Sequence, residues 1–151
     1  MSALEPTAET AANAGDLVLD VSLCCAWCFA DEASEGAWAI LERLQGGRAH
    51  VPALWLWETA NALVQAERRG RISPAAIRTY LGLLEGLPIS LDQPSTATAW
   101  HDTLALARGH RLTSYDAAYL ELALRRGLPL ASRDKALQAA ARLEGVPLMP
   151  C

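Results

Sequence analysis

Short continuous apolar runs alternate along the chain with longer segments of helical periodicity. The first run covers 17–19 and is aliphatic throughout, which is typical of a strand buried on both faces of a parallel sheet. Similar short runs predict strands over 48–52, 88–91 and 129–132, and a last short strand over 146–149.

Between these strands, apolar residues recur three and four positions apart, which predicts amphipathic helices. We expect helices over 23–30, 34–44, 53–69, 74–85, 94–109, 115–126 and 134–143. Ser22, Ser73 and Ser114 have the residue type that caps helix N-termini. Strands that alternate with helices form βαβ units, so we predict an α/β fold in which helices cover both faces of a parallel sheet of four to five strands.

Length and composition agree with one globular domain. The chain has 151 residues, of which 52% are hydrophobic and 20% charged, and we assign a single domain to 16–151. Residues 1–15 are small, polar and acidic, and we expect them to form a flexible tail rather than a secretory signal. No apolar run approaches the length of a membrane span, so we expect a cytoplasmic protein with no membrane partner.

Charge and cysteine content narrow the chemistry. The net charge of −4 argues against a general nucleic-acid coat protein, although it allows an enzyme that meets nucleic acid through a metal site. Cys25 and Cys28 have C-x-x-C spacing, but no second Cys/His pair completes a zinc site. We interpret them, together with Cys24, as semi-buried helix residues in a reducing cell.

Four acidic residues fall at positions that a parallel sheet would bring together. Asp20 ends the first strand, Glu58 lies early in the helix after the second, Asp116 begins a later helix, and Asp134 follows the fourth strand. Ligands of open α/β sheets bind beyond the carboxyl ends of the strands. Because clustered carboxylates raise one another's pKa, such a group is best explained by a bound Mg²⁺ or Mn²⁺ ion.

Each acid also has a plainer interpretation. Asp20 could be an isolated strand-end residue, and Glu58 could lie on a solvated helix face. Asp116 and Asp134 could simply stabilise helix N-termini. The joint placement of the four, rather than any one of them, favours a metal site.

Three polar residues could support these acids. Ser22 lies two positions after Asp20. Asn61 shares a helix face with Glu58 and could orient it, or could be a buried asparagine bonded to the backbone. Ser132, two positions before Asp134, could contact the metal shell or cap the helix.

Five segments carry a further signal: LVLDVS (17–22), PALWLWETANAL (52–63), RRGRIS (68–73), LTSYDAAYL (112–120) and PLASRDKAL (129–137). Together they resemble the PIN-domain ribonucleases, most closely VapC-type toxins of bacterial toxin–antitoxin pairs. Their order and spacing make the resemblance specific, and Tyr-Asp-Ala-x-Tyr is its most distinctive part. Two departures are the cysteines near residue 25 and Ser132, where threonine is common.

The resemblance implies a three-layer α/β/α sandwich and a Mg²⁺- or Mn²⁺-dependent endoribonuclease. It also implies that the four acids form the metal site, with Asn61 and Ser132 assisting. A homodimer, and inhibition by a small VapB-like antitoxin whose tail blocks the site, are further implications.

An RNA substrate would need positive charge and stacking surfaces. Arg68, Arg69 and Arg71 cluster after the long helix and could contact phosphates, or could simply complement the helix dipole. Trp55 and Trp57 could stack on bases, although packing in the core or a dimer interface explains tryptophan more often.

Two other classes of function stay open. A phosphohydrolase or phospho-acceptor domain could use Asp20 as its nucleophile, although a haloacid-dehalogenase-like enzyme would need an aspartate where Ser22 stands. A non-catalytic interaction module would keep its carboxylates solvated or paired with arginines, and would bind a partner through its tryptophans.

Overall fold

The computed structural model describes residues 14–151 and contains a four-stranded sheet. The strands are β1 (Leu17–Leu19), β2 (Ala49–Pro52), β3 (Ile89–Asp92) and β4 (Leu130–Ala131). They are all parallel and stand in the order β3-β2-β1-β4. In place of a fifth strand, Leu148 makes one isolated parallel bridge to Leu130. The predicted parallel sheet is therefore confirmed with four strands.

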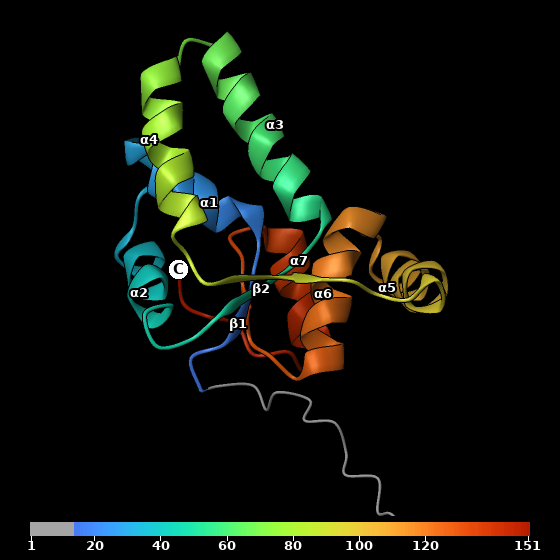
Figure 1. The fold of residues 1–151 in the computed structure, drawn as a ribbon. Helices are drawn as coiled ribbons and strands as arrows, with labels where there is room; N and C mark the ends of the chain where they lie inside the picture. Colours follow the sequence, from blue (N-terminus) through green and yellow to red (C-terminus); the bar gives the residue numbers. More distant parts are fainter. Residues whose placement is uncertain (1–13) are drawn as a thin grey trace, which may run out of the picture.

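Helices surround the sheet. They are α1 (Val21–Cys28), α2 (Glu35–Arg43), α3 (Leu54–Arg68), α4 (Pro74–Glu85), α5 (Thr103–His110), α6 (Ser114–Arg126) and α7 (Lys135–Leu143), with short 3₁₀ and π turns at Ala30–Glu32 and Thr98–Asp102. Figure 1 shows α2 on one side of the sheet, α5, α6 and α7 on the other, and the α3–α4 pair projecting beyond the strands. The arrangement is the three-layer α/β/α sandwich implied by the resemblance. None of the helices within 14–151 is long and apolar enough to cross a membrane.

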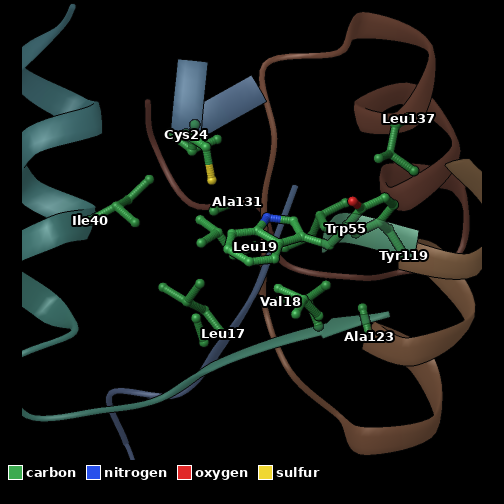
Figure 2. Packing of buried hydrophobic residues seen from close by; sticks show 14 of the residues in the cluster. Leu17, Val18, Leu19, Cys24, Ile40, Trp55, Tyr119, Ala123, Ala131 and Leu137 are labelled. Atoms are coloured by element: carbon green, nitrogen blue, oxygen red, sulfur yellow. The ribbon is translucent and has the colours of Figure 1, made fainter. Parts of the chain in front are cut away.

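The central strand is wholly buried. Leu17, Val18 and Leu19 are each 0% exposed. Figure 2 shows them among core side chains that include Trp55 and Tyr119. Each such side chain contributes about 1.5–3 kcal/mol on burial. This burial holds the end of β1 rigidly, which matters because the strand ends directly at Asp20.

Two predicted helix caps are wrong by one or two residues. The first helix begins at Val21, so Asp20 is its N-cap residue and Ser22 lies inside it. The N-cap of α6 is Thr113 rather than Ser114, because the Thr113 backbone is extended and its hydroxyl accepts a 3.1 Å hydrogen bond from the Asp116 amide. Ser73 caps α4 as predicted.

The helix predicted over 94–109 is also different in the structure. The helical segment begins at 96, a π turn covers Thr98–Asp102, and regular α5 follows and extends to His110. Arg111 then adopts a left-handed conformation, with φ of 55°, and closes the helix.

An unpredicted group of charges closes one side of the domain. Asp92 ends the edge strand β3 and is 5% exposed, and Arg125 of α6 donates to it at 2.5 Å. The same guanidinium donates to buried Glu121 at 2.7 Å. Arg125 therefore compensates two buried carboxylates and links α6 to β3.

The predicted flexible tail falls almost entirely on residues 1–13, which lie outside the described residues. Ala14 and Gly15 are described, and the Arg43 guanidinium donates hydrogen bonds to both of their carbonyls. These two residues are thereby attached to α2.

Candidate functional site

Asp20 stands at the carboxyl end of β1 and is 3% exposed. Its Oδ2 atom accepts two hydrogen bonds, from Ser22 Oγ at 2.8 Å and from Ser132 Oγ at 2.7 Å. The strand register explains the second bond. Leu19 pairs with Ala131, so Asp20 and Ser132, which directly follow them, lie side by side. Two hydroxyls thus fix the orientation of this carboxylate.

Asp134 caps α7 at the same edge of the sheet. Its Oδ1 accepts a 2.8 Å hydrogen bond from the Leu137 amide, so the plainer interpretation of this residue, a helix cap, is correct for one of its oxygens. Ser132 Oγ accepts from the Asp134 amide at 3.1 Å while donating to Asp20. Ser132 therefore connects the two acids.

Glu58 and Asp116 approach from α3 and α6. Glu58 lies in the second turn of α3, half-buried, and Tyr119 of α6 donates a 2.5 Å hydrogen bond to its Oε1. Asp116 lies in the first turn of α6, also half-buried, three positions before Tyr119. One face of α6 therefore carries one acid and the hydroxyl that contacts another.

The four carboxylates act on one another electrostatically. Burial raises the pKa of Asp20, against the lowering effect of its hydroxyl partners, and the charge of Asp134 raises it further. Burial raises the pKa of Glu58, and Asp20 and Asp116 add to the rise. Burial also raises the pKa of Asp116, with contributions from Asp134 and Asp20. Asp20, Glu58, Asp116 and Asp134 therefore lie close enough in the fold for their charges to interact.

The donor chemistry of this cluster fits a hard divalent cation. Every side-chain donor is an oxygen, and a cation would relieve the repulsion that raises these pKa values. Within 14–151, no three His, Cys, Asp or Glu side chains are already close enough to enclose an ion. The carboxylates interact through their charges, but their oxygens do not converge on a single point within 14–151.

Other predicted residues lie apart from the cluster. Asn61 is exposed, so the interpretation as a buried asparagine is wrong, and within the described chain it makes no hydrogen bond to Glu58. Arg68 and Arg69 lie at the far end of α3, about 15 Å along the helix from Glu58 at 1.5 Å per residue.

Arg71 serves a structural contact. It pairs with Asp31 at 2.7 Å and Glu32 at 3.1 Å, and its guanidinium lies 3.9 Å from the centroid of the Phe29 ring. These contacts attach the α3–α4 turn to the segment after α1. The charge of Arg71 is therefore already compensated within the chain.

The tryptophans and cysteines divide by burial. Trp55 is 4% exposed and belongs to the core, whereas Trp57 is 68% exposed.

Cys24 is buried and Cys25 half-buried, and both are free thiols. Burial raises the pKa of Cys25 to about 11, so it is an unreactive thiol, in agreement with the interpretation as a helix residue.

Two contacts around the acids were not predicted. The role of Tyr119 could have been suspected, because a tyrosine three positions after Asp116 on an apolar helix needs a partner for its hydroxyl. Arg133 gave no sequence signal. Its amide donates to Ser22 Oγ at 2.9 Å, which attaches the loop after β4 to the start of α1. Its guanidinium donates to the Glu32 carbonyl in the 3₁₀ turn after α1.

These features define a class of protein: a three-layer α/β/α domain with four carboxylates at the carboxyl edge of a parallel sheet. Residues 17–143 match the PIN domain, and the chain belongs to this family. PIN domains are generally nucleases that use divalent metal ions. A comparison with curated protein sequences gave no match.

Two solved structures share the fold. The crystal structure of PAE2754 from Pyrobaculum aerophilum has a TM-score of 0.64 and 23% identity, covering 83% of this chain and 84% of that one. The crystal structure of FitAcB from Neisseria gonorrhoeae has a TM-score of 0.61 and 16% identity, covering 89% of this chain and 96% of that one. At these identities the likeness establishes the fold.

Proposed function

We propose that the protein is a Mg²⁺- or Mn²⁺-dependent endoribonuclease. The observation that carries the proposal is the placement of four carboxylates at one edge of the sheet, where burial and neighbouring negative charges raise the pKa of Asp20, Glu58 and Asp116. Carboxylates placed close together repel one another unless a positive charge compensates them, and these four have no arginine or lysine partner within 14–151. The proposed metal-holding residues are Asp20, Glu58, Asp116 and Asp134.

The chain's own residues prepare this site in three ways. Ser22 and Ser132 hold Asp20 through Oδ2, and the helix cap holds Asp134 through Oδ1, so both acids are oriented before any ligand arrives. Asp116 remains half-buried and open to solvent. When bound, the cation polarises the phosphodiester and lowers the pKa of a water molecule.

The test is cleavage of a single-stranded RNA oligonucleotide with and without Mn²⁺. Asp20→Asn and Asp116→Asn each remove one proposed ligand with little change in volume. Glu42→Gln, on an exposed position of α2, is the matched control. We expect cleavage by the parent and the control only. Equal cleavage by all four proteins, or cleavage in EDTA, would refute the proposal.

We further propose that the ribonuclease is the toxin of a VapC-type pair, cytoplasmic, with a VapB-like antitoxin. An apolar cavity of about 430 Å³ between α3, α4 and β3 supports a protein partner, and it is lined by residues that include Leu56, Leu81 and Leu91. These three are each more than a third exposed. Induced expression should arrest growth, and Asp116→Asn should abolish the arrest. Normal growth with the parent protein would argue against a toxin.

A homodimer is proposed on separate grounds. Trp57, Trp100 and Tyr115 are 68%, 71% and 64% exposed, which is unusual for large aromatic residues outside an interface. Light scattering should give twice the chain mass, and Trp100→Glu should shift it to the monomer. Trp38→Glu, on α2, is the control, because Trp38 is less exposed at 46%. A monomeric parent protein would refute the dimer.

The two alternative functions are less well supported. A phospho-acceptor needs an accessible nucleophile, whereas Asp20 is 3% exposed and its Oδ2 accepts two hydrogen bonds. A purely structural module would pair its carboxylates with arginines, as Asp92 does with Arg125. The four carboxylates of the proposed metal site lack such partners within 14–151.

A further inference from the structure

The hydroxyl of Tyr119 is the only hydrogen-bond partner of the Glu58 carboxylate among residues 14–151. It donates to Oε1 at 2.5 Å, across 61 positions of the chain. Oε2 accepts no hydrogen bond within that part of the chain, so one carboxylate oxygen is held and the other is available. The bond is short, as expected for a hydroxyl that donates to a charged oxygen.

Tyr119 is suited to hold another side chain in place. It is 0% exposed, and Figure 2 shows its ring in the core near Trp55 and Leu137. A ring packed on all sides keeps one rotamer, so its hydroxyl has a fixed position. A phenol hydroxyl is protonated at neutral pH, so this group is available as a donor.

Glu58, in contrast, has little else to fix it. Its side chain is long and half-buried, and a free glutamate samples several rotamers. The serines that fix Asp20 and the cap that fixes Asp134 have no counterpart here. Without Tyr119, the neighbouring charges of Asp20 and Asp116 would push the carboxylate towards solvent.

We propose that Tyr119 is a positioning residue that holds Glu58 in the acidic cluster, so that α6 supplies one acid directly and orients a second. This inference rests on the proposed function, because the position matters only if Glu58 holds a cation. A partner that orients a metal-holding carboxylate is typically worth 10- to 100-fold in metal affinity. Tyr119 does not contact substrate and is not a catalytic residue.

The experiment compares Tyr119→Phe with Tyr80→Phe. Tyr80 is also buried, at 8% exposure, and its hydroxyl donates to the carbonyl of Cys24, away from the acids. Each substitution removes one buried hydroxyl and keeps the ring, so both should cost similar stability. Only Tyr119→Phe should weaken Mn²⁺ binding, by about 10-fold or more. Equal Mn²⁺ affinity in the two variants would overturn the proposal.

A double substitution tests whether Tyr119 acts through Glu58. In a Glu58→Gln background, Tyr119→Phe should cause little further loss of Mn²⁺ affinity, because the carboxylate that it positions is already gone. Independent, multiplicative losses would show that Tyr119 acts by another route and would contradict the inference.

A measurement without metal separates this inference from the proposed function. The ¹³C signal of the Glu58 carboxyl group, assigned by its loss in Glu58→Gln, should shift in metal-free Tyr119→Phe and not in Tyr80→Phe. An unchanged signal refutes the positioning role even if the enzyme is active. A shifted signal in a protein that binds no Mn²⁺ refutes the proposed function and leaves the contact established.

Discussion

The hydroxyl of Ser132 donates a 2.7 Å hydrogen bond to Oδ2 of Asp20, a residue 112 positions earlier in the chain. The same Oγ accepts from the amide of Asp134. One buried serine thus joins the ends of β1 and β4 and relates two acids of the cluster. The hydroxyl is needed both as a donor and as an acceptor, which only serine or threonine provides at this size.

Replacing Ser132 should therefore damage the site selectively. Ser132→Ala removes a hydrogen bond that lowers the pKa of Asp20, so this pKa should rise further and Mn²⁺ affinity should fall by about 10-fold or more. Ser132→Thr keeps the hydroxyl and should restore most of the affinity. Calorimetric titration with Mn²⁺ measures both, and equal binding by the alanine and threonine variants would contradict the assigned role.

Asp116→Asn should raise the stability of the metal-free protein and lower its cleavage activity. The substitution removes one of the repelling charges, so the metal-free protein should melt roughly 1–3 °C higher. Mn²⁺-dependent cleavage should fall by about 100-fold or more. Removing a residue that only hydrogen-bonds to a metal ligand already costs about 10- to 100-fold in affinity or activity, and removing a ligand should cost at least as much. Thermal melting in EDTA, with Glu42→Gln as control, checks the first part. A lower Tm would show that Asp116 is stabilising where it stands.

The pH dependence of stability follows from the raised carboxylate pKa values. Unfolded, these acids titrate near 3.8 for aspartate and 4.5 for glutamate, and in the folded protein they titrate higher. The folded state therefore binds more protons, and the contribution of these groups is fully present below their unfolded pKa and is lost as pH rises through the folded pKa.

Metal-free protein should accordingly lose stability as pH rises from about 4 towards neutrality. Asp116→Asn should flatten this fall, because one titrating group is gone. The increase in Tm on adding Mn²⁺ should be larger at pH 8 than at pH 5, since protons compete with the cation at the lower pH. Melting curves across this range test the prediction, and an equal metal effect at both pH values would count against it.

Arg125→Met should be strongly destabilising. The guanidinium compensates Asp92 and Glu121, which are 5% and 6% exposed, so its removal leaves Glu121 without its partner and Asp92 with only the longer contact to Arg126 within 14–151. Breaking such a pair costs about 3–5 kcal/mol, and we expect the lower end because Arg125 is partly exposed. Arg126→Met is the control, since this more exposed side chain lies 3.4 Å from Asp92. Urea unfolding should separate the two variants clearly.

The three arginines proposed for RNA contact should behave differently from one another. Arg71 is engaged with Asp31, Glu32 and Phe29, so Arg71→Ala should lower Tm. Arg68→Ala and Arg69→Ala remove no ion pair that is seen within 14–151, so Tm should stay the same. These two substitutions should instead weaken RNA binding in a salt-dependent manner. Fluorescence anisotropy with a labelled RNA in EDTA measures binding without cleavage. Unchanged binding by both variants would remove these residues from the substrate interface.

Much of the fold could be predicted from local pattern. The continuous apolar run at 17–19 and the helical spacing after it are properties of neighbouring residues. The strand appears where expected, and the helix begins two residues earlier than predicted. Errors arose where local signals compete. Thr113 and Ser114 are both good caps, and the choice depends on which backbone is extended. The π turn before α5 left no separate mark in the apolar spacing.

The sequence by itself determined which residues are acidic, apolar or helix-capping, and thus that acids would follow buried strands. Only the tertiary structure decided their partners. Ser132 meets Asp20 because β4 pairs with β1, and Tyr119 meets Glu58 because the fold brings the second turn of α6 close to the second turn of α3. Hydrogen bonds and charge repulsion act over a few ångströms, whereas these partners are far apart in the chain. Strand order and helix packing, which no local pattern encodes, therefore bring acids that are far apart in the chain close enough for their charges to interact.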